Sequence, residues 1–140
     1  MSEARELAIA RRDLARAEAE LDSAEGLARL VEGLGLLDGL IAGRDKAAAR
    51  TARNLAASYV GRIYERIRAA VALDPHMPEP KLEHYFKVML ALDQVGEALP
   101  ATAAELKLAL ARALIDRYYE GHSPEQKRRA LEQLAALTGH

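Results

Sequence analysis

The chain of 140 residues contains no cysteine and no tryptophan, and aromatic residues make up only 4% of it. The lack of cysteine excludes disulfides, thiolate metal ligands and a cysteine nucleophile. None of the four histidines has a histidine or carboxylate partner in a helical metal motif such as His-Glu-x-x-His or Glu-x-x-His. We therefore expect neither a metal site nor a cofactor.

The motifs of familiar enzymes are also missing. The sequence has no glycine-rich phosphate loop, no nucleophile elbow and no paired-carboxylate motif. An excess of positive charge is lacking too, because the formal net charge is −1, so nucleic acid is not an expected partner. The chain has no run of 18 uncharged apolar residues and no apolar leader, which predicts a cytoplasmic protein that does not enter a membrane.

Alanine and leucine dominate what is present, and apolar residues recur at helical spacing along most of the chain. The five prolines fall between these periodic segments rather than inside them. The pattern predicts an all-α fold, a single-domain helical bundle of about six helices that spans residues 1–140. The expected helices cover residues 2–22, 23–42, 46–73, 81–98, 102–121 and 123 onward, and the first two form either two helices or one long one.

The first expected helix, an N-terminal arm over about residues 2–22, carries a narrow apolar seam. Leu7, Leu14 and Leu21 recur every seven residues, with Ala10 and Ala17 between them. Such a heptad is typical of a coiled coil, in which small residues let two helix backbones approach closely. We expect this seam to bind a partner protein, most simply a second copy in a homodimer. The alternative is packing within the chain's own bundle.

The second expected helix has an unusual load of glycine, and Gly35, Gly39 and Gly43 form one ridge on it. Interior glycines cost a helix about 0.8–1 kcal/mol each relative to alanine. A bare ridge behind a wide apolar face indicates a helix enclosed on two sides. The alternative is a groove along Gly35 and Gly39 that binds a partner or an apolar ligand.

The third expected helix is basic, since residues 43–73 carry seven Lys or Arg and two Asp or Glu. Arg50, Arg53 and Arg68 flank one side of its apolar stripe together with Lys46. One interpretation is an anion-binding patch. The preferred one is charge pairing with acidic neighbouring segments inside the bundle. On the stripe itself we expect Leu55, Ile63 and Ile67 to be core residues.

Arg117 and His122 are separated by four residues near the end of the fifth expected helix. This spacing resembles that of HEPN-type RNases, although Tyr118 stands where that family often has Asn. The resemblance implies an all-α domain in which His122 moves a proton and Arg117 stabilises phosphate charge. The alternative is that both residues favour a helix C-terminus, where positive charge is stabilising.

Taken together, the sequence favours a non-enzymatic protein-interaction module, such as an adaptor, a chaperone-like protein or a regulatory bundle. This expectation follows mainly from the lack of catalytic motifs. The alternatives are an RNase that uses Arg117 and His122, and a binder of apolar ligands along the second helix.

Overall fold

The computed structural model describes residues 3–120 and 123–138 and shows an all-α bundle, as predicted. Its helices lie close to the expected segments. They are α1 (Glu3–Ala19), α2 (Ala24–Ile41), α3 (Lys46–Leu73), α4 (Glu79–Leu92), the 3₁₀-helix η1 (Asp93–Ala98), α5 (Ala103–Tyr118) and α6 (Pro124–Thr138). No helix within these described ranges is long and apolar enough to cross a membrane.

Side-chain caps set several of the helix starts. The Ser23 hydroxyl accepts a hydrogen bond from the Gly26 amide at 2.9 Å, and an Asp45 carboxylate oxygen accepts one from the Ala48 amide at 3.1 Å. Both bonds satisfy amides that have no partner inside their helix. The Ser23 cap also answers the question left open by the sequence, because residues 20–23 form a turn and α1 and α2 are two helices.

Two local expectations are wrong. The fourth helix was expected to reach residue 98 but ends at Leu92, and the chain continues as η1 with a non-helical backbone at Val95. Thr102 and Glu105 have the spacing of a capping box, which predicts that the Thr102 hydroxyl caps α5, yet Thr102 has helical dihedral angles and makes no capping bond. Its hydroxyl instead lies 2.8 Å from that of Tyr64, because tertiary packing brings α3 beside the start of α5.

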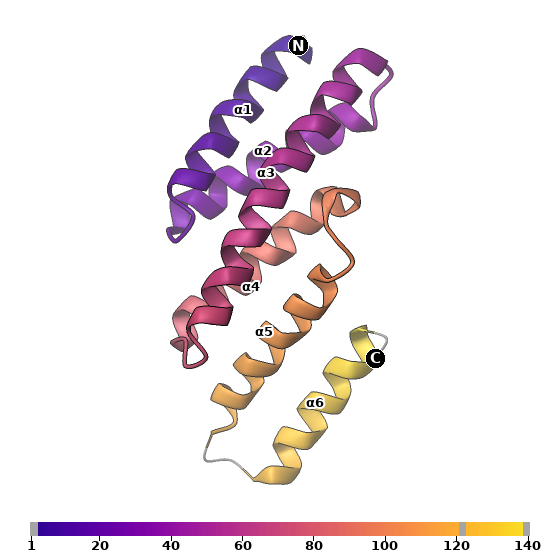
Figure 1. Cartoon of the computed structure of the whole chain (residues 1–140). Helices are drawn as coiled ribbons and strands as arrows, with labels where there is room; N and C mark the ends of the chain where they lie inside the picture. The colour runs from indigo at the N-terminus through magenta and orange to yellow at the C-terminus, as the bar shows by residue number, and fades with distance from the viewer. Residues whose placement is uncertain (1–2, 121–122, 139–140) are drawn as a thin grey trace.

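The helices follow one another across an elongated molecule (Figure 1). Both α1 and α2 pack against each other and against α3, while α4 packs against α2, α3 and α5. The last helix, α6, packs against α5 and has no fully buried side chain among its described residues. Because each helix packs mainly on helices near it in the sequence, much of its surface faces solvent.

The core runs along the middle of α3. Ile63 and Ile67 are completely buried, as predicted, whereas Leu55 is only half-buried. Ala56 and Val60 occupy the buried positions at this level of the helix instead. The buried stripe is therefore rotated slightly from the one expected, toward the side that faces α1, α2 and η1.

Hydrogen bonds tie the α1–α2 turn to α3 and α4. Arg62 donates to both carboxylate oxygens of Glu18, at 2.8 and 3.2 Å, and this bond lowers the pKa of the Glu18 carboxyl. The Tyr85 hydroxyl donates to Asp22 at 2.8 Å. Burial is the larger cause and this bond to a carboxylate is the second, and together they raise the pKa of Tyr85 to about 12. These contacts hold the first hairpin against the rest of the bundle.

Candidate functional site

The N-terminal seam is covered by the chain itself. Leu14, Ala10 and Ala17 are completely buried and Leu21 is 3% exposed, while Leu7 packs at the margin of the core. Their cover comes from α2 and α3. The structure therefore shows the alternative packing, in which the chain's own helices cover the seam, and the homodimer stays a prediction.

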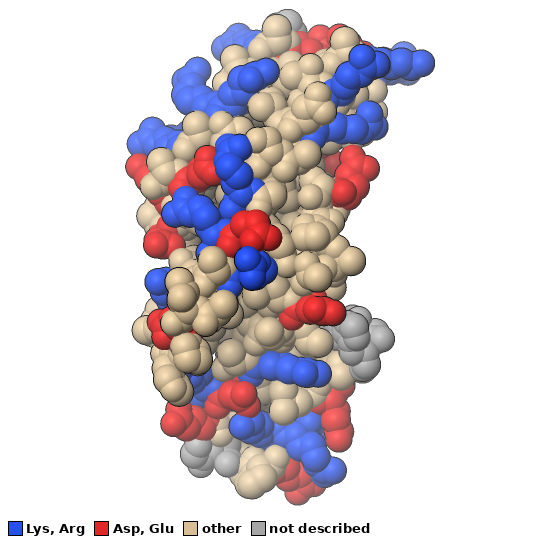
Figure 2. All heavy atoms as spheres, viewed as in Figure 1, with Lys and Arg blue, Asp and Glu red and all other residues tan. Residues whose placement is uncertain are grey.

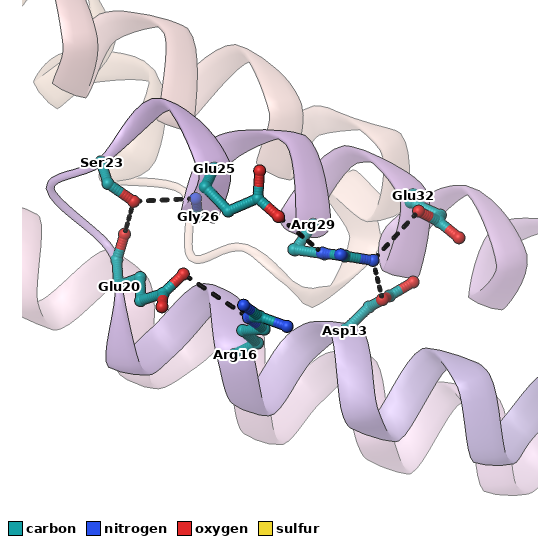
Figure 3. A network of polar contacts seen from close by, with 8 residues as sticks. All are labelled: Asp13, Arg16, Glu20, Ser23, Glu25, Gly26, Arg29 and Glu32. Atoms are coloured by element: carbon teal, nitrogen blue, oxygen red, sulfur yellow. Dashed lines mark hydrogen bonds and ion pairs between the residues drawn. The ribbon is translucent and has the colours of Figure 1, made fainter.

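A polar network lies along the same α1–α2 interface (Figure 3). Arg29 of α2 contacts Glu25 at 3.2 Å, Asp13 at 3.5 Å and Glu32 at 4.0 Å. Asp13 is only 3% exposed, and its second carboxylate oxygen has no hydrogen-bond partner among the described residues. A buried carboxylate held by one long contact adds little stability to the hairpin. Glu25 of this network also lines a pocket of about 540 Å³ at the α1–α2 turn.

The glycines of α2 divide into two kinds. Gly26 and Gly33 are buried where α1 comes close, and a Cβ atom on Gly26 would lie 2.0 Å from the backbone oxygen of Glu20. Gly35 and Gly39 are exposed, and a Cβ atom on Gly39 would meet nothing within 4 Å. The predicted ridge is therefore open rather than enclosed, and the close approach uses glycines on the other side of the helix.

This difference predicts opposite effects for the same substitution. Gly39→Ala should raise the free energy of unfolding by about 0.8–1 kcal/mol, because alanine favours an exposed helix interior. Gly26→Ala should lower it by about 1–3 kcal/mol, because the new methyl group forces the Glu20 backbone to shift. Urea unfolding followed by circular dichroism measures both. Equal effects of the two substitutions would contradict this packing of α1 on α2.

The predicted anion-binding residues do not form one group. Arg50 and Arg53 lie together in the first part of α3, whereas Arg68 lies 18 residues beyond Arg50, or about 27 Å along the helix. Arg68 pairs with Glu65 of its own helix at 2.9 Å. The three side chains share a side of the helix but not a position along it, so Arg68 does not belong to a common site.

Arg50 and Arg53 line a basic cleft between the end of α2 and the start of α3, with a volume of about 440 Å³. The basic cleft is lined by Ile41, Gly43, Lys46, Ala49, Arg50, Arg53 and Asn54. Lysine and arginine side chains also project from this end of the molecule, near the turn between α2 and α3 (Figure 2). The lining thus combines three cations with small apolar residues and contains no carboxylate.

Only one of the three cations has an acidic partner among the described residues. Arg53 lies 3.6 Å from Glu97 of η1, which confirms the expected contact with an acidic neighbour. Both side chains of that pair are more than half exposed, and an exposed pair of this kind contributes little stability. Lys46 and Arg50 form no ion pair within the same part of the chain, so their charge is available to an anion from outside.

The position of Lys46 is unfavourable for the helix itself. It is the first residue of α3, whose first turn contains no acidic residue. The N-terminus of a helix carries partial positive charge, so cations there are destabilising by a few tenths of a kcal/mol. Asp45 offsets part of this effect through its capping bond. A cation at a helix N-terminus without a packing reason points to a functional role. The helix N-terminus, Lys46 and Arg50 all attract an anion.

Sequence reasoning found the cations but not the cleft. Lys46, Arg50 and Arg53 are visible as one basic flank of an amphipathic helix, whereas Ile41 joins them only because the 42–45 turn folds α2 back beside α3. Gly43 ends α2 and Asp45 starts α3, and these two signals place the turn in the sequence. The angle at which the helices meet depends on the packing of both helices and has no local signal.

Only Arg117 of the alternative catalytic pair lies among the described residues. Arg117 is half-buried, and its guanidinium donates a hydrogen bond to the backbone oxygen of Met77 at 3.0 Å. His122 lies outside the described residues. Across those residues, no group of three or more His, Cys, Asp or Glu side chains could hold a metal ion.

Comparisons of the chain with protein-family models, with curated proteins and with solved structures find no match. The case for function therefore depends on the geometry of the described residues.

Proposed function

We propose that the protein is a non-enzymatic interaction module that binds an acidic segment of a partner protein in the basic cleft. The observation that carries this proposal is the pair Lys46 and Arg50, two cations without acidic partners among the described residues, in the lining of one cleft at a helix N-terminus. Carboxylates of a partner would form charge-assisted hydrogen bonds with both side chains. Such binding suits an adaptor or a regulatory bundle.

A protein segment fits the basic cleft better than nucleic acid does. Proteins that bind nucleic acid commonly neutralise about 6–10 phosphates, whereas this cleft offers three cations and the whole chain has a net charge of −1. Ile41 and Ala49 add apolar surface beside the cations. Apolar side chains of a peptide can pack there while its carboxylates bind the cations of the cleft. The two kinds of contact together give affinity and fix the position of the peptide in the cleft.

The two alternative functions have less support. An RNase would need Arg117 and His122 together at one phosphate, but His122 lies outside the described residues, so the described geometry does not support this pair. A binder of apolar ligands along α2 would need an enclosed groove, but Gly35 and Gly39 lie on exposed surface. The basic cleft brings together two cations, Lys46 and Arg50, that have no acidic partner among the described residues.

Selection from a random peptide library tests the proposal. We expect the immobilised protein to enrich peptides that carry Asp or Glu next to apolar residues. A Lys46→Ala, Arg50→Ala double variant should bind a selected peptide at least about tenfold more weakly, since each charge-assisted hydrogen bond contributes about 1.5–3 kcal/mol. Affinity for the parent protein should also fall as salt rises. Fluorescence anisotropy measures both effects.

Arg68→Ala is the matched control, because it removes a cation from the same helix about 27 Å from Arg50. It should leave the affinity for the selected peptide unchanged within about twofold, well under 1.4 kcal/mol. Enrichment of peptides without acidic residues, or equal losses in the double variant and the control, would remove the basic cleft as the site. Tighter binding of a single-stranded RNA oligonucleotide than of any selected peptide would favour a nucleic-acid partner instead.

A further inference from the structure

A second cleft lies at the other end of α3, between the α3–α4 turn and α5, and has a volume of about 220 Å³. Its apolar lining includes Met77, Leu82 and Leu110, each of which is at most 5% exposed. The same cleft is lined by Asp74 on the turn and by Arg117 on α5. It thus combines a buried apolar floor with charged residues on two opposite elements.

The charge of Arg117 is not neutralised within the described part of the chain. Its hydrogen bond goes to the Met77 carbonyl, which is neutral, and none of the described carboxylates forms an ion pair with it. A guanidinium has five N–H donors, so most of them remain available after this bond. A half-buried guanidinium above an apolar floor is a good partner for a carboxylate, which it can bind through two hydrogen bonds.

The two acidic residues of this cleft differ in whether a cation compensates their charge. Asp116 pairs with Lys127 of α6 at 2.6 Å, so its charge is compensated. One Asp74 oxygen accepts a hydrogen bond from the His76 backbone amide at 3.2 Å, and no cation of the described chain pairs with this carboxylate. Two uncompensated charges of opposite sign, Asp74 and Arg117, therefore line one small cleft without pairing with each other.

We infer that this cleft binds a free amino acid with an apolar side chain. The ligand's carboxylate meets Arg117, its ammonium group meets Asp74, and its side chain packs on Met77, Leu82 and Leu110. The volume is below the range of about 300–1,000 Å³ that is usual for drug-sized ligands, which limits the occupant to a small molecule. The site is separate from the basic cleft, and the inference does not depend on the proposed function.

Titration calorimetry with L-valine, L-leucine and L-methionine tests the inference. We expect saturable binding of at least one of them at millimolar concentration. Two analogues of leucine should bind at least about tenfold more weakly, since each lacks one charged group. These are 4-methylpentanoate, which has no ammonium group, and 3-methylbutylamine, which has no carboxylate. Binding of 4-methylpentanoate as tight as that of leucine would show a carboxylate site and contradict the role given to Asp74.

Two variants on opposite walls of the cleft check the assignment. Arg117→Gln and Asp74→Asn should each weaken binding of the best amino acid at least about tenfold. Arg112→Gln, which changes an exposed arginine of α5 outside this lining, should leave it unchanged. Circular dichroism confirms that each variant is folded. The inference fails if none of the three amino acids binds, or if the Asp74→Asn variant binds like the parent protein.

Discussion

The Leu14→Glu variant should lose its fold. Leu14 is completely buried between α1 and its neighbours, and a Cβ atom on Gly33 of α2 would lie only 3.0 Å from it. The change removes a buried leucine, which costs about 2–5 kcal/mol, and places there a charge whose burial costs several kcal/mol more. The sum is comparable to the whole stability of a typical domain, about 5–15 kcal/mol. Circular dichroism and light scattering will show whether the variant is folded and in which assembly.

Ala15→Glu is the matched control for this prediction. It introduces the same side chain one residue later on α1, at an exposed position, and should leave the fold intact. The homodimer that the N-terminal seam predicts would give another outcome for Leu14→Glu. If the parent protein is a dimer and Leu14→Glu is a folded monomer, then this seam pairs two copies and the packing of α1 described above is wrong.

Ile63→Ala should lower the free energy of unfolding by about 2–5 kcal/mol, the usual cost of truncating a fully buried isoleucine. Ile63 is completely buried in the middle of α3, where the surrounding helices leave little freedom to close the resulting cavity. Urea unfolding followed by circular dichroism measures the change.

Leu73→Ala provides the comparison within the same helix, because Leu73 is 85% exposed. Its effect should stay within about 0.5 kcal/mol, as is usual for surface substitutions. A cost below about 0.5 kcal/mol for Ile63→Ala as well would place the core elsewhere than along α3.

The helices could be predicted because their signals are local. Leucine and alanine at helical spacing and prolines between segments both depend on residues a few positions apart. The segment 93–98 shows where this fails. Its composition continues the apolar pattern of α4, yet the chain turns there so that Val95 is buried and Glu97 faces Arg53.

The surfaces could not be predicted in the same way, because they depend on which helix covers which face. The heptad of Leu7, Leu14 and Leu21 is compatible with a second copy or with the chain's own helices, and only the packing of α2 and α3 decides between them. A helical wheel also discards position along the axis. It therefore places Arg68 with Arg50, although a distance of about 27 Å along the helix separates them.

The chain-order packing of the helices has a consequence for how the protein folds. Most helices contact those next to them or one further along the sequence, although α2 also contacts η1, and the turns between α1, α2 and α3 are short. Closing short loops costs little chain entropy, and folds built from such local contacts reach the native state within microseconds to milliseconds. The apolar seam of α1 is then covered soon after α2 and α3 leave the ribosome, which shortens the time during which it can aggregate.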